Sequence, residues 1–107
     1  MKEQRYPQLD ERAVTATQPN GLPVCVVPKP GFAKKCAYFV TNYGSMDTKF
    51  TWMGRAYDTP AGVAHYLEHK MFKMPDRDVM QEFYALGANP NAFTRYNMTA
   101  YCFTCTE

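Results

Sequence analysis

The chain has 107 residues, of which 46% are hydrophobic and 21% are charged, a composition typical of one globular domain at most rather than a disordered or fibrous chain. Twelve basic and ten acidic residues are scattered along it, without the Lys/Arg stripe that nucleic-acid binding needs. Because no apolar run approaches the roughly 18 residues of a membrane span and no secretion signal opens the chain, we expect a cytoplasmic protein with no nucleic-acid or membrane partner.

The N-terminal part is predicted to be a leader followed by a hairpin. Residues 1–13 are polar and contain proline, so we expect them to be flexible. The β-prone runs 14–18 and 22–27 flank Asn20-Gly21, a dipeptide that tolerates the positive φ angles of a tight turn. A β-hairpin is therefore expected around this dipeptide.

The middle of the chain is predicted to hold a strand, a loop and a helix. Residues 36–42 are aromatic and β-branched, which favours a strand buried on at least one face. Residues 45–58 show no clear period, so we expect a long ordered loop. Thr59 can cap a helix, with Pro60 at its first position, and this helix should run to about Lys73.

The last third is predicted to hold a second helix and a second hairpin. Asp78 with Gln81 resembles a capping box, and Gly87 is placed to end the helix in a left-handed conformation. The run 91–106 is strand-like, with a break near Tyr96 that would fold it into a hairpin. This order of elements indicates an α+β fold, with helices packed on one face of a mixed or mostly antiparallel sheet.

The candidate chemistry is concentrated in one run, which reads His65-Tyr66-Leu67-Glu68-His69. At roughly 100° per residue, the two histidines and Glu68 share one face of a helix. An apolar stripe on the opposite side is expected to bury the helix, and it consists of Val63, Leu67, Met71 and Met74. Two imidazoles one turn apart can bind one zinc ion, and the carboxylate beside them can take a proton from a bound water. The pattern favours metal-dependent peptide hydrolysis, although such ligands also accept other divalent ions.

The residues around this motif resemble a known family. The segment from Gly62 to Phe72 is similar to the inverted zinc motif of the pitrilysin/insulinase peptidases, the inverzincins. The run Asn91-Ala92-Phe93-Thr94 is similar to the active-site edge strand of that family, and the similarity extends over the chain from about residue 14. It is closest to the bacterial cytosolic, processing-protease-like branch.

The resemblance implies a role for each matching residue. His65 and His69 would be zinc ligands, and Glu68 would be the general base. Asn91, Ala92, Phe93 and Thr94 would bind a peptide or protein substrate by adding it as a strand to the sheet edge. A homo- or hetero-dimer with a related subunit is also implied.

The resemblance further implies that residues 14–107 are the N-terminal part of a truncated catalytic domain. In the family the third zinc ligand is a glutamate roughly 70 to 80 residues beyond the motif, a distance that this chain does not reach. We therefore expect the chain by itself to bind zinc weakly and to hydrolyse little or nothing. Two alternatives stay open: a non-catalytic partner or structural subunit of a peptidase-like complex, and a carbon–sulfur lyase with a related motif. The predicted edge strand favours the peptidase over the lyase.

Four cysteines are present, at positions 25, 36, 102 and 105. Without a secretion signal they are expected to be buried, reduced thiols rather than a disulfide framework. A structural zinc site is the less favoured alternative, because Cys102 and Cys105 would point to opposite faces of one strand.

Overall fold

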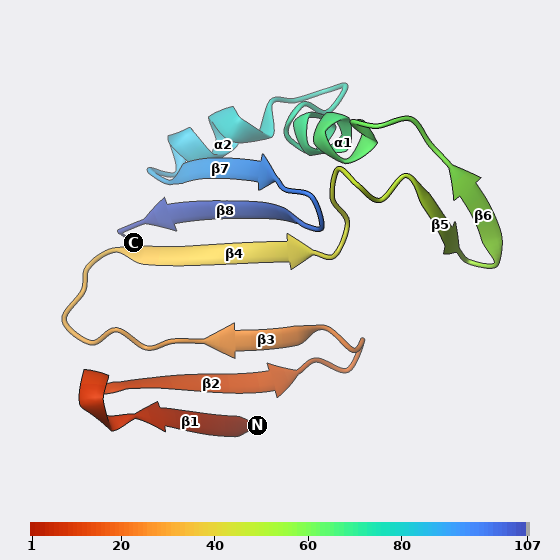
Figure 1. The fold of residues 1–107 in the computed structure, drawn as a ribbon. Coiled ribbons are helices and arrows are strands. Elements are labelled where there is room, and N and C mark those ends of the chain that lie inside the picture. Colours follow the sequence, from red (N-terminus) through yellow and green to blue (C-terminus); the bar gives the residue numbers. More distant parts are fainter. Residues whose placement is uncertain (107) are drawn as a thin grey trace. The chain divides into compact units, whose positions relative to one another are not determined.

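The computed structural model describes residues 1–106, which fall into two compact units that divide after Phe32 and are described one at a time. The first unit contains a three-stranded antiparallel sheet with the order β1-β2-β3 (Figure 1). Its elements are β1 (Lys2–Tyr6), the 3-10 helix η1 (Pro7–Leu9), β2 (Glu11–Thr17) and β3 (Pro23–Val26).

The expectation of a flexible leader over residues 1–13 is wrong. Lys2 pairs with Thr15 and Tyr6 pairs with Glu11, so the first strand is a full member of the sheet. Every residue of β1 is exposed. The apolar alternation that reveals a half-buried strand is therefore missing from it, and its pairing with β2 decides its structure.

The predicted hairpin around Asn20-Gly21 is confirmed. Gly21 has a φ of +87°, a left-handed conformation that suits glycine. The amide of Gln18 donates to the Leu22 carbonyl at 2.8 Å, and the amide of Leu22 donates to the Asn20 side-chain oxygen at 3.1 Å. These two hydrogen bonds close the turn between β2 and β3.

The second unit is built on another antiparallel sheet, with the strand order β4-β8-β7 (Figure 1). Its strands are β4 (Lys35–Thr41), β7 (Asn89–Thr94) and β8 (Thr99–Cys105). Two helices accompany them, α1 (Val63–Phe72) and α2 (Val79–Ala85). The hairpin β7-β8 turns at the predicted break near Tyr96.

Both helices cover the same face of this sheet, as the α+β prediction requires. The ring of Phe72 on α1 lies 6.0 Å from that of Tyr101, and the ring of Phe83 on α2 lies 5.4 Å from that of Phe103. Tyr101 and Phe103 are two residues apart in β8, so their side chains point to the same side. The predicted fold class is confirmed.

Residues 45–58 do not form the expected loop. They contain a hairpin made of β5 (Lys49–Trp52) and β6 (Arg55–Asp58). Its turn, Met53-Gly54, has φ angles of 48° and 73°, both positive as a type I′ turn requires. Methionine is unusual at a turn position with positive φ, so the sequence did not predict this turn. Phe50 stacks on Tyr57 with ring centroids 5.3 Å apart, and this contact stabilises the hairpin.

Helix α1 begins later than predicted. Gly62, with a φ of +92°, occupies its N-cap, and Thr59 and Pro60 precede it. The hydroxyl of Thr59 donates instead to the Thr48 carbonyl at 3.0 Å, and the Thr59 amide donates to the same carbonyl at 2.8 Å. The threonine thus closes the base of the β5-β6 hairpin, and its side chain is not available to cap a helix.

Helix α2 has the predicted boundaries. The Asp78 carboxylate accepts a hydrogen bond from the Met80 amide at 3.0 Å, and Gly87 follows the helix with a φ of +71°. Asp78 is the expected N-terminal cap, although its carboxylate binds the amide of Met80 and not that of Gln81, the position a capping box uses, and Gly87 is the expected left-handed ending. Neither α1 nor α2 has the length and hydropathy of a membrane span, and they are the two α-helices of the described chain.

The cysteines are less buried than expected. None of the four is in a disulfide, but Cys25 and Cys36 are exposed and the other two are half-buried. Cys36 lies on β4, an edge strand whose residues are exposed from Lys35 to Val40. Cys102 and Cys105 are three residues apart in β8 and point to opposite faces, as predicted.

Candidate metal centre

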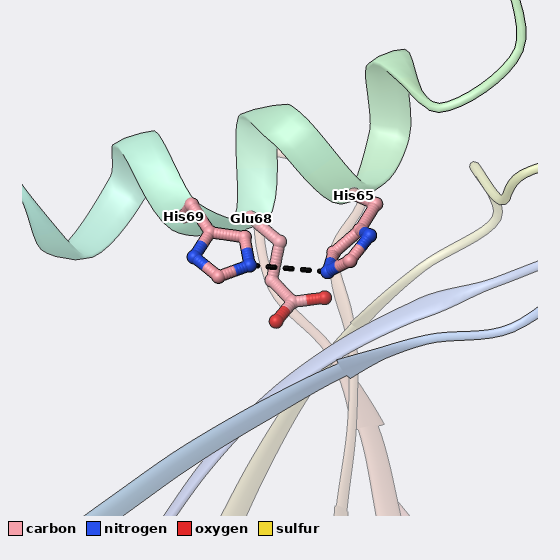
Figure 2. A group of neighbouring side chains, drawn as sticks. All are labelled: His65, Glu68 and His69. Carbon is pink, nitrogen blue, oxygen red and sulfur yellow. Dashed lines mark hydrogen bonds between the residues drawn. The ribbon is translucent and has the colours of Figure 1, made fainter.

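Three side chains on α1 form a compact group of potential metal ligands. Nε2 of His65 and Nε2 of His69 are 3.0 Å apart, and one atom each of His65, Glu68 and His69 lie within 4.8 Å of one another. Figure 2 shows both rings and the carboxylate extending from the same side of the helix. No other group of three His, Cys, Asp or Glu side chains in residues 1–106 comes this close.

The spacing of the two imidazoles suits a shared ion. Two nitrogens bound to a tetrahedral zinc at the usual bond length are about 3.3 Å apart, close to the distance between these two Nε2 atoms. The rings are tilted by 49° with centroids 4.8 Å apart, so they converge rather than stack. The helical period places both rings over one turn, which is why the sequence predicted this part of the site.

The three side chains differ in their exposure. His65 and His69 are exposed, whereas Glu68 is buried, with 9% of its surface exposed. The hydroxyl of Thr94 on β7 donates a hydrogen bond to Oε2 of Glu68. A buried carboxylate needs such a partner to offset the cost of leaving water. The two imidazoles are therefore accessible to a ligand, while the Glu68 carboxylate is bound by a residue of the sheet.

The packing of α1 differs from the prediction. Ala64 and Glu68 are its buried residues, and Phe72 one turn further contacts the sheet. Leu67 and Met71, which belong to the apolar stripe expected to bury the helix, are 45% and 49% exposed. The face that carries Glu68 is the one that packs on the sheet, and there the Thr94 hydroxyl of β7 binds the carboxylate.

Strand β7 lies at one edge of its sheet, as the resemblance implied. The Arg95 amide donates to the Met98 carbonyl at 2.7 Å, so Arg95 and Met98 form a hydrogen-bonded pair at the end of the β7-β8 ladder. Because such pairs alternate in antiparallel strands, the backbone groups of Ala92 and Thr94 point away from β8, toward the open edge. The Asn91 side chain already accepts a hydrogen bond from the Ala92 amide at 2.9 Å.

The four residues expected to bind substrate are thus not equivalent in position. Thr94 contacts Glu68, and Ala92 lies on the same face of β7. Phe93 points to the other face and packs under the guanidinium of Arg95, at 5.3 Å from its ring centroid. Asn91 is exposed. Of the four, Thr94 is the one for which the structure gives a contact with the candidate group, through Glu68.

Tyr101 is a further residue near Glu68; it belongs to the segment 99–101 that resembles the family, but the sequence assigned it no role. It lies directly opposite Ala92 in the strand register. Burial of the phenol, together with the negative charge of Glu68, raises the pKa of Tyr101 above its ordinary value. No spacing rule links Tyr101 to the zinc motif, because only the pairing of β7 with β8 brings it there.

Comparisons with known proteins agree with this geometry. The model of the family "Insulinase (Peptidase family M16)" matches residues 52–107, more than half of the chain. The chain belongs to this peptidase family. The relatives that it resembles include the uncharacterized zinc protease YmfH of Bacillus subtilis (strain 168), which is 46% identical over 104 residues, or 95% of this chain and 24% of YmfH. AlbF of the same strain is 32% identical over 99 residues, covering 92% of this chain and 23% of AlbF.

The fold is shared with a solved structure. A crystal structure of an M16-like peptidase from Alicyclobacillus acidocaldarius superposes with a TM-score of 0.83 at 41% identity, covering 91% of this chain and 23% of the other. The resemblance seen in the zinc motif and the edge strand is therefore confirmed at the level of family and fold. The chain spans about a quarter of the length of the relatives that it matches.

Proposed function

We propose that this chain carries the metal-binding helix of a zinc metalloendopeptidase. The observation behind the proposal is the 3.0 Å separation of the two Nε2 atoms, with a carboxylate in the same group. Imidazole nitrogens and a nearby carboxylate are the donors that catalytic zinc sites use. In this proposal His65 and His69 are the zinc ligands and Glu68 is the general base.

The proposed chemistry is hydrolysis of a peptide bond. Zinc, when bound, would act as a Lewis acid and lower the pKa of a bound water to about 7. The Glu68 carboxylate is then placed to accept a proton from the attacking water and to return it to the leaving amine. Thr94 binds Oε2 of Glu68, so Oε1 is the oxygen left for proton transfer.

A complete site requires more than the described residues supply. Catalytic zinc usually has three protein ligands, whereas this group offers two imidazoles besides the proposed base. We propose that a further ligand comes from outside residues 1–106. The chain by itself is then expected to bind zinc weakly and to have little or no hydrolytic activity.

We propose that the substrate is an extended peptide that pairs with the open edge of β7. The outward backbone groups of Ala92 and Thr94 would provide the hydrogen bonds of an added strand. Asn91 and Phe93 flank these groups and complete the candidate binding segment. Backbone pairing gives affinity with little sequence preference. A cytoplasmic location and a related dimer partner stay predictions.

The test uses the full-length protein with Glu68→Gln. We expect this variant to retain zinc, because both histidines remain, and to lose peptide cleavage by roughly 100-fold or more, because the base is removed. Zinc content by atomic emission and cleavage of a fluorogenic peptide are the measurements. Glu82→Gln on α2 is the matched control, since the exposed Glu82 side chain forms an ion pair with exposed Arg77, at 3.8 Å.

Two outcomes would redirect the assignment. Undiminished cleavage by Glu68→Gln would show that another group is the base. A full-length wild-type protein that binds zinc but cleaves no peptide would favour the non-catalytic partner of a peptidase-like complex.

A further inference from the structure

The hydrogen bond between Thr94 and Glu68 joins two elements that are distant in the sequence. The two residues are 26 positions apart, one on β7 and the other on α1. This hydrogen bond ties the Glu68 carboxylate to the sheet, where Glu68 is buried and 9% exposed. We propose that Thr94 is a positioning residue, whose hydroxyl fixes the carboxylate of Glu68 in the orientation needed for proton transfer. This inference rests on the proposed function.

A glutamate needs such a partner because its side chain is long. Three rotatable bonds let the carboxylate occupy many positions around a helix, and most of them miss a water bound near the two imidazoles. A hydroxyl that donates to one carboxylate oxygen selects one of these positions and leaves the other oxygen available. A general base must first lie within hydrogen-bond reach of the proton that it accepts, and its pKa matters only after that.

The position of Thr94 is set by its pairing in the sheet. It is the last residue of β7 and pairs with Thr99, which is 2% exposed. Thr99 is anchored in turn by a hydrogen bond of 2.7 Å from its hydroxyl to the Tyr43 carbonyl. Threonine also has restricted rotation about its first side-chain bond, which limits where the Thr94 hydroxyl can point.

The same residue faces both the base and the proposed substrate edge. The backbone groups of Thr94 point away from β8, while its side chain binds Glu68. An extended peptide paired with Thr94 would therefore lie beside the carboxylate. In this proposal Thr94 positions both the substrate backbone and the general base. This role is more specific than contact with substrate alone.

The experiment compares hydroxyl deletion with hydroxyl retention in the full-length zinc-loaded protein. Thr94→Val removes the hydroxyl and keeps the shape, and Thr94→Ser keeps the hydroxyl. We expect Thr94→Val to lower kcat roughly 10- to 100-fold with KM changed little, and Thr94→Ser to restore kcat to within a few-fold of wild type. Thr104→Val on β8 is the control for threonine loss elsewhere in the sheet, and it should leave kcat unchanged. Thr94→Ala is the second deletion in case the valine variant does not fold.

Two readouts besides activity separate this inference from the proposed function. Zinc affinity by competition titration should be the same in wild type, Thr94→Val and Thr94→Ser, because the Thr94 hydroxyl binds Glu68, the proposed base, and both proposed zinc ligands are unchanged. Crystal structures should show the Glu68 carboxylate displaced in the valine variant and in place in the serine variant. In a Glu68→Gln background, Thr94→Val should have no further effect on the residual rate.

Several results would overturn the inference. Wild-type kcat in Thr94→Val, equal impairment of the serine and valine variants, or an undisplaced Glu68 carboxylate in the Thr94→Val crystal would each do so. Loss of zinc from Thr94→Val would assign Thr94 to the metal site and would also overturn it. If the wild-type protein cleaves no peptide, the proposed function fails, and the position of Glu68 in the two crystals still decides the inference.

Discussion

The hydroxyl of Thr99 donates a hydrogen bond of 2.7 Å to the backbone carbonyl of Tyr43. Thr99 begins β8 and pairs with Thr41 on one side and Thr94 on the other. Tyr43 lies just beyond the end of β4. The bond therefore fixes the end of the three-stranded sheet at which Thr94 meets Glu68.

Replacing Thr99 with valine should destabilise the second unit. The substitution keeps the shape but leaves the Tyr43 carbonyl without its hydroxyl donor, a loss of about 1 to 3 kcal/mol in the free energy of unfolding. Urea denaturation followed by circular dichroism measures this loss. Thr99→Ser retains the donor and should recover most of the stability; equal loss in both variants would mean that the methyl group matters more than the bond.

Gly44 lies against the backbone of the β7-β8 turn, so a methyl group added at this position would clash with it. A Cβ atom there would lie 2.5 Å from Arg95 O, Met98 N and Tyr96 C, none of which can move without disturbing the β7-β8 turn. We expect Gly44→Ala to cost about 3 kcal/mol of unfolding free energy, as overpacking of a rigid site does. Gly54→Ala is the control, because Gly54 has a φ of +73° but an added Cβ atom there would meet no atom within 4 Å beyond its neighbours in the chain. It should cost only about 1 to 2 kcal/mol from backbone strain, and a Gly44→Ala cost no larger than this would contradict the prediction.

Alkaline pH should destabilise the second unit through Tyr101. Burial and the Glu68 charge raise the pKa of this phenol, so the folded state holds its proton to higher pH than the unfolded state. The resulting stability is fully present below about pH 10 and is lost as pH rises through the folded-state pKa. Denaturation midpoints measured from about pH 8 to about pH 11 should fall less steeply in Tyr101→Phe than in wild type. Parallel curves would rule out this contribution.

Zinc binding by the 107-residue chain should be weak and should depend on both histidines. Two imidazoles fall short of the three protein ligands that a stable catalytic site normally has. In a competition titration we expect no tight stoichiometric binding, and a further loss of roughly 10-fold or more in His69→Ala. A full-length protein should bind much more tightly. Tight binding by the 107-residue chain would show that another of its side chains completes the site.

Elements with strong local signals were predictable, and elements without them were not. Asn20-Gly21 and the Asp78 cap correctly marked a turn and a helix start. The β5-β6 hairpin was missed because Met53 adopts a positive φ that its residue type does not suggest. Strand β1 was missed because all its residues are exposed and its order comes from pairing with β2.

The local sequence determined that His65, Glu68 and His69 share a helical turn, because the period of a helix depends only on backbone hydrogen bonds between near neighbours. Tertiary structure decided which face of α1 is buried, that Thr94 reaches Glu68, and that Tyr101 lies opposite Ala92. These relationships depend on strand register and on helix packing across many residues of chain, and neither follows from the spacing of residues within one element.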